Sequence, residues 1–438
     1  MSKLVKYFLL LYLLFLAGCS FDKKTGFWTK TKKITKAEKI EKKIKEIFVE
    51  EKALSKELNT NLKINLSANL INNSFINNFD NNNGRVNYNG NLKNISKYKF
   101  AKINDFNEFE PEIVFDKDNI IFFDNKGSIL KFDKSSKLVW KKNYYSKSEK
   151  KLNPILFLAR NNDVLVVADN ISKYYAIDIS SGELLWSKNN TSPFNSQVKI
   201  YNDNFFVIDF ENVLKCFSLK DGKEIWSMKT DQSFIKSQKK LSLIIINNVV
   251  YFNNSLGDIS AVNINDGALF WQTPTLGSLL YDEQIFLKTS DLIGDNDSIF
   301  FSNNKNEFFS LDIATGTLNW KQKINSSLRP TLIDDLIFSV SLEGFLFVID
   351  KKSGNIIRVT DIFNEFKSKQ RSKIKPVGFI VGSKNIYLTT DNGKLLIIDI
   401  LTGKTISVLK IDRGKISRPF VLNQNLYIIK ENSVIRLN

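Results

Sequence analysis

The stretch Ala176-Ile177-Asp178-Ile179-Ser180-Ser181-Gly182-Glu183-Leu184-Leu185-Trp186 decides how this chain folds. It predicts a β-strand that ends in Asp178, a tight turn through Gly182, and a second strand that closes with Trp186. Glycine takes the positive φ that such a turn requires, and aspartate accepts backbone hydrogen bonds within it. Trp186 is large enough to fill the space between two sheets, and its indole N–H can reach a backbone carbonyl.

The same pattern returns along the chain, each time closing in a tryptophan. The tryptophans of the five copies are Trp140, Trp186, Trp226, Trp271 and Trp320. They are about 40–50 residues apart, and a period of this size with four short strands indicates the blades of a β-propeller. Two later copies keep the turn but have Arg358 and Ser407 where the others have tryptophan. The pattern resembles the tryptophan-docking repeat of quinoprotein-like propellers, and it covers about residues 98–438.

Counting the second strand of every repeat predicts the number of blades. These apolar runs are Ile120–Phe123, Val164–Ala168, Phe205–Ile208, Val249–Phe252, Ile299–Phe301, Leu336–Val340, Ile386–Leu388 and Leu426–Ile429. The last repeat is one strand short, and residues 97–103 can supply its missing outer strand. We therefore expect an all-β, eight-bladed propeller over residues 98–438, closed by an N-terminal strand that covers the open sheet edge.

The N-terminus predicts export and lipidation. Lys3 and Lys6 precede the apolar run Tyr7–Leu16, which is too short to span a bilayer as a stable anchor. The run ends in Leu16-Ala17-Gly18-Cys19, which resembles the lipobox of bacterial lipoprotein signal peptides. That resemblance implies a signal peptide over residues 1–18 and fatty acyl chains such as palmitate on Cys19. Ser20 in place of aspartate implies the outer membrane, on its periplasmic face; an uncleaved signal anchor is the alternative.

Two segments separate this signal from the propeller. Residues 19–58 are highly charged, with apolar residues near helical spacing, and predict a lipidated tether that is helical or flexible. Residues 59–97 are rich in asparagine and serine, and predict an irregular segment that lies against the propeller or is disordered.

Composition excludes several kinds of chemistry. The chain of 438 residues has a formal net charge of +17 but no compact arginine-rich patch with interleaved aromatics, so nucleic acid is not an expected partner. It contains no histidine, which excludes Ser-His-Asp and Cys-His nucleophiles and imidazole-ligated metal sites. Cys216 aligns with Ala176 and Ala261 of other repeats and predicts a buried, inert thiol.

One group of cations has a position that suggests a role. Arg329, Lys375 and Arg418 each precede a proline at the start of an innermost strand, in three successive blades. Such positions gather around one mouth of the central channel, where these residues would form a basic arc for an acidic partner segment. Three unrelated surface cations are the alternative.

The lipobox, the tether and an eight-bladed ring together resemble the BamB family, the propeller lipoproteins of the outer-membrane β-barrel assembly machinery. The resemblance implies a non-enzymatic scaffold that binds the barrel-forming subunit and its substrates, as a monomer within a hetero-complex. It also places partner contacts on loops in the middle of the ring. Phe234, Ile235 and Lys236 match one such loop and Asp291 another, although the family's own residues are replaced at these positions.

A quinone-dependent dehydrogenase is the sharpest alternative on this fold. The resemblance to those enzymes implies a calcium-bound quinone, an aspartate base and usually two adjacent cysteines. This chain has no adjacent cysteines, and its aspartates recur once per repeat, as structural turns do. We expect no enzyme activity, no cofactor and no metal. A periplasmic ligand-binding or quinone-dependent propeller stays open, as does a sensor or polysaccharide-binding lipoprotein.

Overall fold

The computed structural model describes residues 20–21, 28–29, 54–72, 84–103, 106, 109, 111–231, 239–275 and 287–438. The chain divides into two units, Met1–Glu51 and Lys52–Asn438. In the first unit, the short strands β1 (Ser20–Phe21) and β2 (Trp28–Thr29) pair antiparallel. Among the described residues, no helix is both long enough and apolar enough to cross a membrane.

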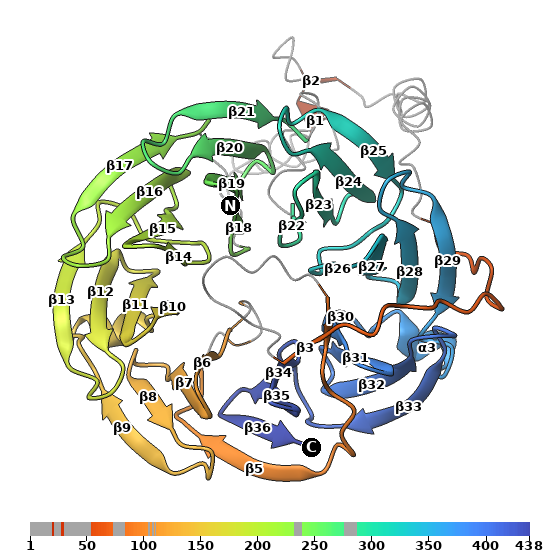
Figure 1. Ribbon diagram of the computed structural model, residues 1–438, viewed down its shortest axis with the longest axis horizontal. Helices are drawn as coiled ribbons and strands as arrows, with labels where there is room; N and C mark the ends of the chain where they lie inside the picture. Colours follow the sequence, from red (N-terminus) through yellow and green to blue (C-terminus); the bar gives the residue numbers. More distant parts are fainter. Residues whose placement is uncertain are drawn as a thin grey trace, which may run out of the picture. The chain divides into compact units, whose positions relative to one another are not determined.

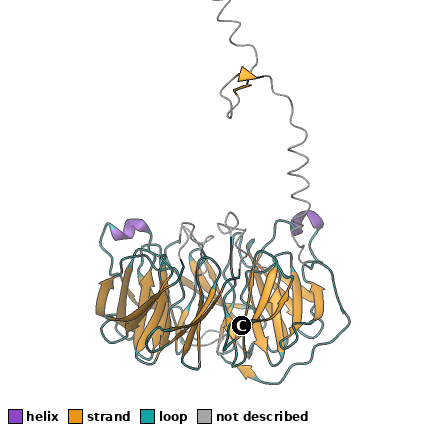
Figure 2. Ribbon diagram, turned by 90° about the horizontal axis from the view of Figure 1, so that it is seen from above, coloured by secondary structure: helices purple, strands orange, loops and turns teal. Residues whose placement is uncertain are grey.

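The second unit is a ring of sheets around a central axis (Figure 1). Its described strands form eight four-stranded sheets, which confirms the predicted eight-bladed propeller. Figure 2 shows this ring from its edge, with the strands running between its two faces.

Each blade is numbered from its innermost strand outward, and blades 1 to 4 follow one another along the chain. Their strands are β6 (Val114–Asp116), β7 (Asn119–Phe123), β8 (Ile129–Phe132) and β9 (Leu138–Lys142); β10 (Leu156–Asn161), β11 (Val164–Asp169), β12 (Lys173–Asp178) and β13 (Leu184–Asn189); β14 (Lys199–Tyr201), β15 (Asn204–Ile208), β16 (Val213–Ser218) and β17 (Glu224–Lys229); and β18 (Leu243–Ile246), β19 (Val249–Asn253), β20 (Ile259–Asn263) and β21 (Leu269–Thr273).

Blades 5 to 8 complete the ring, and the outer strand of blade 8 comes from the N-terminal side. Their strands are β22 (Ile293–Gly294), β23 (Ser298–Asn303), β24 (Glu307–Asp312) and β25 (Leu318–Gln322); β26 (Thr331–Ile333), β27 (Leu336–Val340), β28 (Phe345–Asp350) and β29 (Ile356–Asp361); β30 (Pro376–Val381), β31 (Asn385–Thr390), β32 (Lys394–Asp399) and β33 (Thr405–Lys410); and β34 (Phe420–Leu422), β35 (Asn425–Lys430), β36 (Ser433–Leu437) and β5 (Asn94–Lys99).

The position of β5 differs slightly from the expected 97–103. The strand begins at Asn94, opposite Leu437, and ends at Lys99, opposite Ser433. Tyr98 is fully buried in this register, with its ring packed edge-on against that of Phe132 in blade 1. The regular strand pairing ends at Lys99, although Phe100 and Ile103 still donate their backbone N–H groups to the carbonyls of Asn432 and Glu431.

Burial explains the apolar runs that marked the repeats. The second and third strands of a blade are covered on both faces by the neighbouring blades, so their central residues are buried without alternation, as in β11 and β19. Outer strands such as β13 and β17 alternate between exposed and half-buried residues, because only one of their faces meets another blade. The core is therefore a series of apolar layers between blades.

The five repeat tryptophans join one blade to the next. Each lies on an outer strand and donates its indole N–H to a backbone carbonyl in the turn of the following blade, over 3.0–3.2 Å; the acceptors are Ile179, Leu219, Ile264, Ile313 and Lys351. The indole ring of each tryptophan packs against the glycine of that turn. A Cβ added at Gly267, which has φ +73°, would lie 2.5 Å from the Trp226 ring, so only glycine fits there.

Arg358 takes the place of tryptophan between blades 6 and 7. Its side chain is fully buried, and its Nη2 donates to the Ile400 carbonyl at 3.2 Å, the position equivalent to the tryptophan acceptors. Its Nη1 donates to the carbonyls of Leu401 and, at 3.0 Å, of Leu62. Burial lowers the pKa of Arg358 to about 10, and Asp399 opposes that shift, so the guanidinium stays charged at neutral pH.

The Asn-rich segment that precedes the ring is attached to it at several places. Leu58 pairs with Val359 on the outer edge of β29, and Ile64 donates its backbone N–H to Leu401. Further along, β3 (Leu70–Ile71) pairs parallel with β4 (Arg85–Val86), and Arg85 donates to the Ser383 carbonyl at 3.1 Å. The described parts of residues 59–97 therefore lie against blades 6 to 8.

Candidate functional site: a charge cluster at the centre of the ring

Charged and polar side chains from six blades meet near the ring axis, two to four residues before the innermost strands begin. We call them the central charge cluster: Glu112, Gln197, Lys239, Lys240, Asp291, Arg329 and Arg418. Because every innermost strand of a propeller runs in the same direction, these positions share one face of the ring. Contacts between non-neighbouring blades show that the cluster spans the axis: Lys240 of blade 4 reaches Glu112 of blade 1.

Glu112 is the first acid of the cluster. Its carboxylate accepts from Lys240 and from Arg418, each at 2.9 Å, and the three side chains are 9–16% exposed. Burial alone would raise the pKa of Glu112, but the charges of Lys240 and Arg418 outweigh burial and hold it below its ordinary value. Glu112 is therefore ionised and bridges blades 4 and 8.

Asp291 is the second acid, and only 5% of it is exposed. Its carboxylate accepts a hydrogen bond from the Gln197 amide at 3.1 Å. Burial would raise its pKa, but the positive charges of Lys239, Lys240, Arg418 and Arg329 hold the pKa well below the usual range. Lys239 also donates to the Ser327 carbonyl at 2.7 Å, so blades 3, 4, 5 and 6 are joined through this part of the cluster.

The structure brings two of the three cations of the predicted basic arc, Arg329 and Arg418, close to Asp291. Arg418 is paired with Glu112, and Arg329 lies close enough to Asp291 to lower its pKa. Lys375 is exposed, and its backbone N–H donates to the Asp391 carboxylate at 2.9 Å. Two of the three cations therefore lie beside acids of the central charge cluster.

The other predicted site residues fall in different places. Asp291 belongs to the cluster and is buried, so it does not stand on an open loop surface. Cys19 and the segment Phe234, Ile235 and Lys236 lie outside the described residues. The repeat tryptophans occupy the blade contacts described above.

Sequence reasoning missed Glu112, Gln197, Lys239 and Lys240. Glu112 and Gln197 occupy the repeat position that singled out Arg329 and Arg418, two residues before the innermost strand, whereas Lys239 and Lys240 lie one or two residues earlier. Arg329 and Arg418 each precede a proline, whereas Glu112, Gln197 and Lys240 do not.

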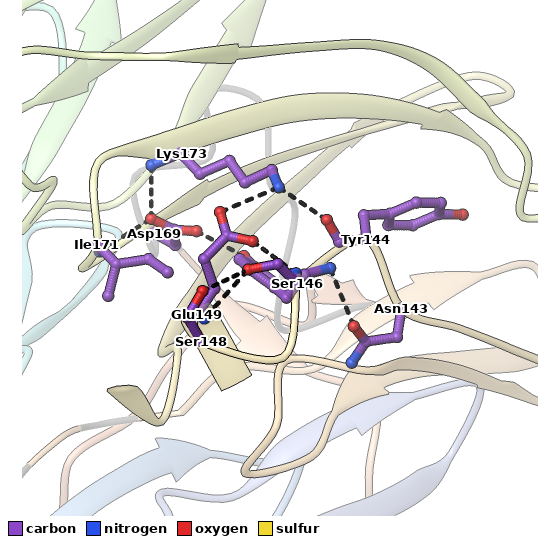
Figure 3. Close-up of polar contacts among 9 residues, drawn as sticks. Asn143, Tyr144, Ser146, Ser148, Glu149, Asp169, Ile171 and Lys173 are labelled. Carbon is purple, nitrogen blue, oxygen red and sulfur yellow. Dashed lines mark hydrogen bonds and ion pairs between the residues drawn. The ribbon is translucent and has the colours of Figure 1, made fainter. Parts of the chain in front are cut away.

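A second polar cluster fixes the loop between blades 1 and 2, which contains the 3-10 turn η1 (Glu149–Leu152) (Figure 3). Lys173 donates to the Tyr144 carbonyl at 2.7 Å and pairs with Glu149 at 3.3 Å. Asp169 is fully buried; it accepts from the Tyr145 hydroxyl at 2.5 Å and from the backbone N–H groups of Ile171 and Lys173. These bonds hold the loop against β12.

Asp169 gives a pH prediction. Burial raises its pKa to about 6, against the lowering effect of its hydrogen bonds. The folded protein then binds a proton more tightly than the unfolded chain does, so this group makes the propeller less stable as the pH rises from about 4 to about 6. We expect Asp169→Asn to remove that decline and to raise the free energy of unfolding at neutral pH by about 1 kcal/mol. Urea unfolding across this pH range measures both effects.

Asparagine at position 169 is a fair replacement, because blade 4 has Asn254 in the equivalent turn. Asn254 Oδ1 accepts the N–H groups of Leu256 and Asp258, as Asp169 Oδ1 accepts those of Ile171 and Lys173. A variant with the same decline as the parent between about pH 4 and 6 would contradict the raised pKa.

The donor set of the cluster does not suit a calcium-bound quinone. Both of its acids are engaged by cations or by an amide, and within the described parts of the chain no group of three or more His, Cys, Asp or Glu side chains is placed to hold a metal ion. Cys216 is fully buried, and burial raises the pKa of its thiol to about 12.

Eight blades, with docked tryptophans at five of the contacts between them, define a propeller of the quinoprotein type. The family model described as "Outer membrane protein assembly factor BamB" matches residues 125–360, more than half of this chain. The chain therefore belongs to the BamB family.

Named relatives agree with this assignment at low identity. The chain is 25% identical over 203 residues to the outer membrane protein assembly factor BamB of Legionella pneumophila, which covers 44% of this chain and 48% of that relative. It is 23% identical over 320 residues to BamB of Shewanella oneidensis, and this alignment covers 60% of this chain and 79% of that relative. The alignment thus spans about half the length of the Legionella relative.

Solved structures share the fold. BamB from Moraxella catarrhalis superposes with a TM-score of 0.64 at 15% identity, over 79% of this chain and 99% of that one. A quinohemoprotein alcohol dehydrogenase from Pseudomonas putida superposes with a TM-score of 0.57 at 10% identity, over 82% of this chain and 78% of that one. Both likenesses concern the propeller architecture alone.

Proposed function

We propose that this chain is a non-enzymatic scaffold of the outer-membrane β-barrel assembly machinery that docks on the barrel-forming subunit and aids the insertion of outer-membrane proteins. The observation that carries the proposal is the BamB family match, which runs from blade 1 to blade 6. The central charge cluster supports a scaffold, because its acids are used to hold blades together and not to activate a substrate.

The proposed docking surface is the face of the ring on which the central charge cluster lies. Phe234, Ile235 and Lys236 are close in sequence to Lys239 and Lys240, which belong to the cluster. Two apolar side chains beside a cation suit an interface whose binding energy depends on a few anchors. Asp291 would support that loop by holding Lys239 and Lys240 in place.

The partner is tested by affinity isolation of the full chain from solubilised membranes. We expect the barrel-forming subunit to be recovered, and recovery to fall at least about tenfold for Phe234→Ala/Ile235→Ala, because truncating a single hot-spot side chain costs about 2 kcal/mol or more. The exposed pair Leu184→Ala/Leu185→Ala, on the outer strand of blade 2, is the matched control. Isolation of unrelated proteins only would disprove the proposed partner.

The proposed location is the periplasmic face of the outer membrane, through lipid chains on Cys19. Two or more acyl chains give firm attachment where one is marginal. We expect Cys19→Ala to move the protein from the sedimented membrane fraction to the soluble fraction, measured by immunoblotting after separation of the two membranes. Cofractionation of this variant with the outer membrane would contradict lipid anchoring at Cys19.

A periplasmic ligand-binding or quinone-dependent propeller is the alternative, since the fold is shared with a quinohemoprotein dehydrogenase. Titration calorimetry of the purified propeller with calcium and a pyrroloquinoline quinone separates the two functions. The scaffold predicts no heat of binding, whereas a stoichiometric signal would favour the enzyme.

A further inference from the structure

The loop between blades 6 and 7 forms a groove on the outer part of the ring. This loop includes the short helix α3 (Ser368–Arg371), which faces the beginning of β32 and the end of β33. Two hollows of about 400 and 470 Å³ lie there, and they adjoin because both are lined by Gln370 and Lys394. Figure 1 shows α3 beside these strands, away from the ring axis.

The charge of the groove is strongly one-sided. Its lining contains four lysines, Lys369, Lys373, Lys394 and Lys410, and one acid, Glu365. We call this surface the lysine groove. Within the described residues, none of the four lysines is in a salt bridge, whereas Arg371 on the same helix pairs with Asp361 at 2.7 Å. The lining therefore carries a net positive charge that no ion pair in the described part of the chain neutralises.

The groove also offers apolar surface. Phe366 and Ile374 form its floor and are 8% and 3% exposed, and the Lys394 ammonium lies 4.3 Å from the centre of the Phe366 ring. On the rim, Ile406 of β33 is 60% exposed. A ligand that fits must therefore bring negative charge for the lysines and an apolar side chain for Ile406.

We propose that the lysine groove binds an acidic segment of a partner protein that carries at least one apolar side chain among its carboxylates. Four ammonium groups around a concave surface concentrate positive potential there and attract carboxylates over a distance of about 8 Å at physiological salt. The apolar rim favours a protein segment over a lipid headgroup, because a headgroup has no side chain to place against Ile406.

This surface is distinct from the proposed docking face at the ring axis. In the central charge cluster the cations are paired with Glu112 or surround Asp291, whereas the groove lysines face solvent. The inference does not depend on the identity of the proposed partner: failure of the binding experiment below would leave the capture of the barrel-forming subunit unaffected.

The test measures fluorescence anisotropy of a labelled peptide in which glutamates flank one leucine and one phenylalanine, titrated with the full chain. We expect Lys369→Glu/Lys373→Glu to weaken binding by at least about tenfold, since it turns attraction into repulsion. The matched control is Lys147→Glu/Lys151→Glu, two exposed lysines on the loop between blades 1 and 2, which changes the net charge equally. This control is expected to weaken binding by less than about twofold.

Three further measurements make the result decisive. Thermal unfolding of both double variants shows whether the ring is intact, and Ile406→Asp, which leaves the lysines in place, is expected to weaken binding as well. Equal losses for the groove pair and the control pair would overturn the inference, because general charge attraction would then explain binding. The third measurement is sedimentation of the protein with phosphatidylglycerol vesicles. If Lys369→Glu/Lys373→Glu abolishes sedimentation but leaves peptide binding unchanged, the inference is overturned in favour of a lipid surface.

Discussion

Replacing Arg358 by alanine is expected to lower the free energy of unfolding by about 3–5 kcal/mol, the range seen when a large buried side chain is truncated and its hydrogen-bond partners are left unsatisfied. The guanidinium is fully buried and donates to the carbonyls of Leu62, Ile400 and Leu401. Without it, three acceptors lose a charged donor, and a large cavity opens between blades 6 and 7. Differential scanning calorimetry or urea unfolding of the Lys52–Asn438 unit within the full chain measures the loss.

Two controls separate packing from hydrogen bonding at this position. Arg358→Trp introduces the residue found at five other blade contacts. The turn that would receive it already suits tryptophan, because Gly403 has φ +70°, as Gly354 beneath Trp320 has +72°. We expect it to recover part of the stability, although the Leu62 carbonyl stays without its donor. Arg358→Met fills the cavity without donating and should resemble alanine more than tryptophan. Full stability of Arg358→Met would show that the hydrogen bonds contribute little.

Replacing Glu112 by leucine is expected to lower the free energy of unfolding by about 3 kcal/mol, because it leaves two nearly buried cations without their carboxylate. Lys240 and Arg418 are 9% and 15% exposed at the side chain, and both contact Glu112 at 2.9 Å. The same change is expected to weaken binding at the proposed docking face, since Lys240 closely follows Phe234, Ile235 and Lys236. Urea unfolding and affinity isolation measure the two effects.

The pH dependence gives an independent check on Glu112. Its pKa is held below the ordinary value in the folded state, so its contribution to stability is present above about pH 4.5 and is lost as the pH falls through the folded pKa. The parent protein should therefore lose more stability between pH 5 and about pH 3 than Glu112→Leu does. The double variant Glu112→Leu/Lys240→Leu should recover much of the loss, because a buried pair replaced by apolar residues is often neutral. Parallel pH profiles would contradict the ionised bridge.

Much of the fold was predictable because it rests on local signals that repeat. Gly182 and Trp186 identify a turn and a docking side chain within one short stretch of sequence. The recurrence of that stretch about every 40–50 residues indicates the blades of a propeller. Strand bounds were less predictable: β5 lies at Asn94–Lys99, since its register depends on burying Tyr98 against blades 8 and 1.

The candidate site was predictable only in part. Arg329 and Arg418 were found through their position before the innermost strand, and Asp291 through a family resemblance, yet nothing local in the sequence joins them. Gln197 and Asp291 are 94 residues apart, and their hydrogen bond exists because two blades face the same axis. The lysine groove is similar, since α3 and the end of β33 are more than 30 residues apart and meet only when blade 7 has folded.

The sequence alone determined the repeat, the number of blades and the prediction of a lipidated Cys19, because each depends on residues close together in the chain. Tertiary structure decided which charges meet. It paired Arg418 with Glu112, buried Asp291, and gave Arg358 the role that tryptophan has between other blades. The physical reason is that ring closure brings distant blades together around one axis, and electrostatic and hydrogen-bond energies depend on distances that no local pattern contains.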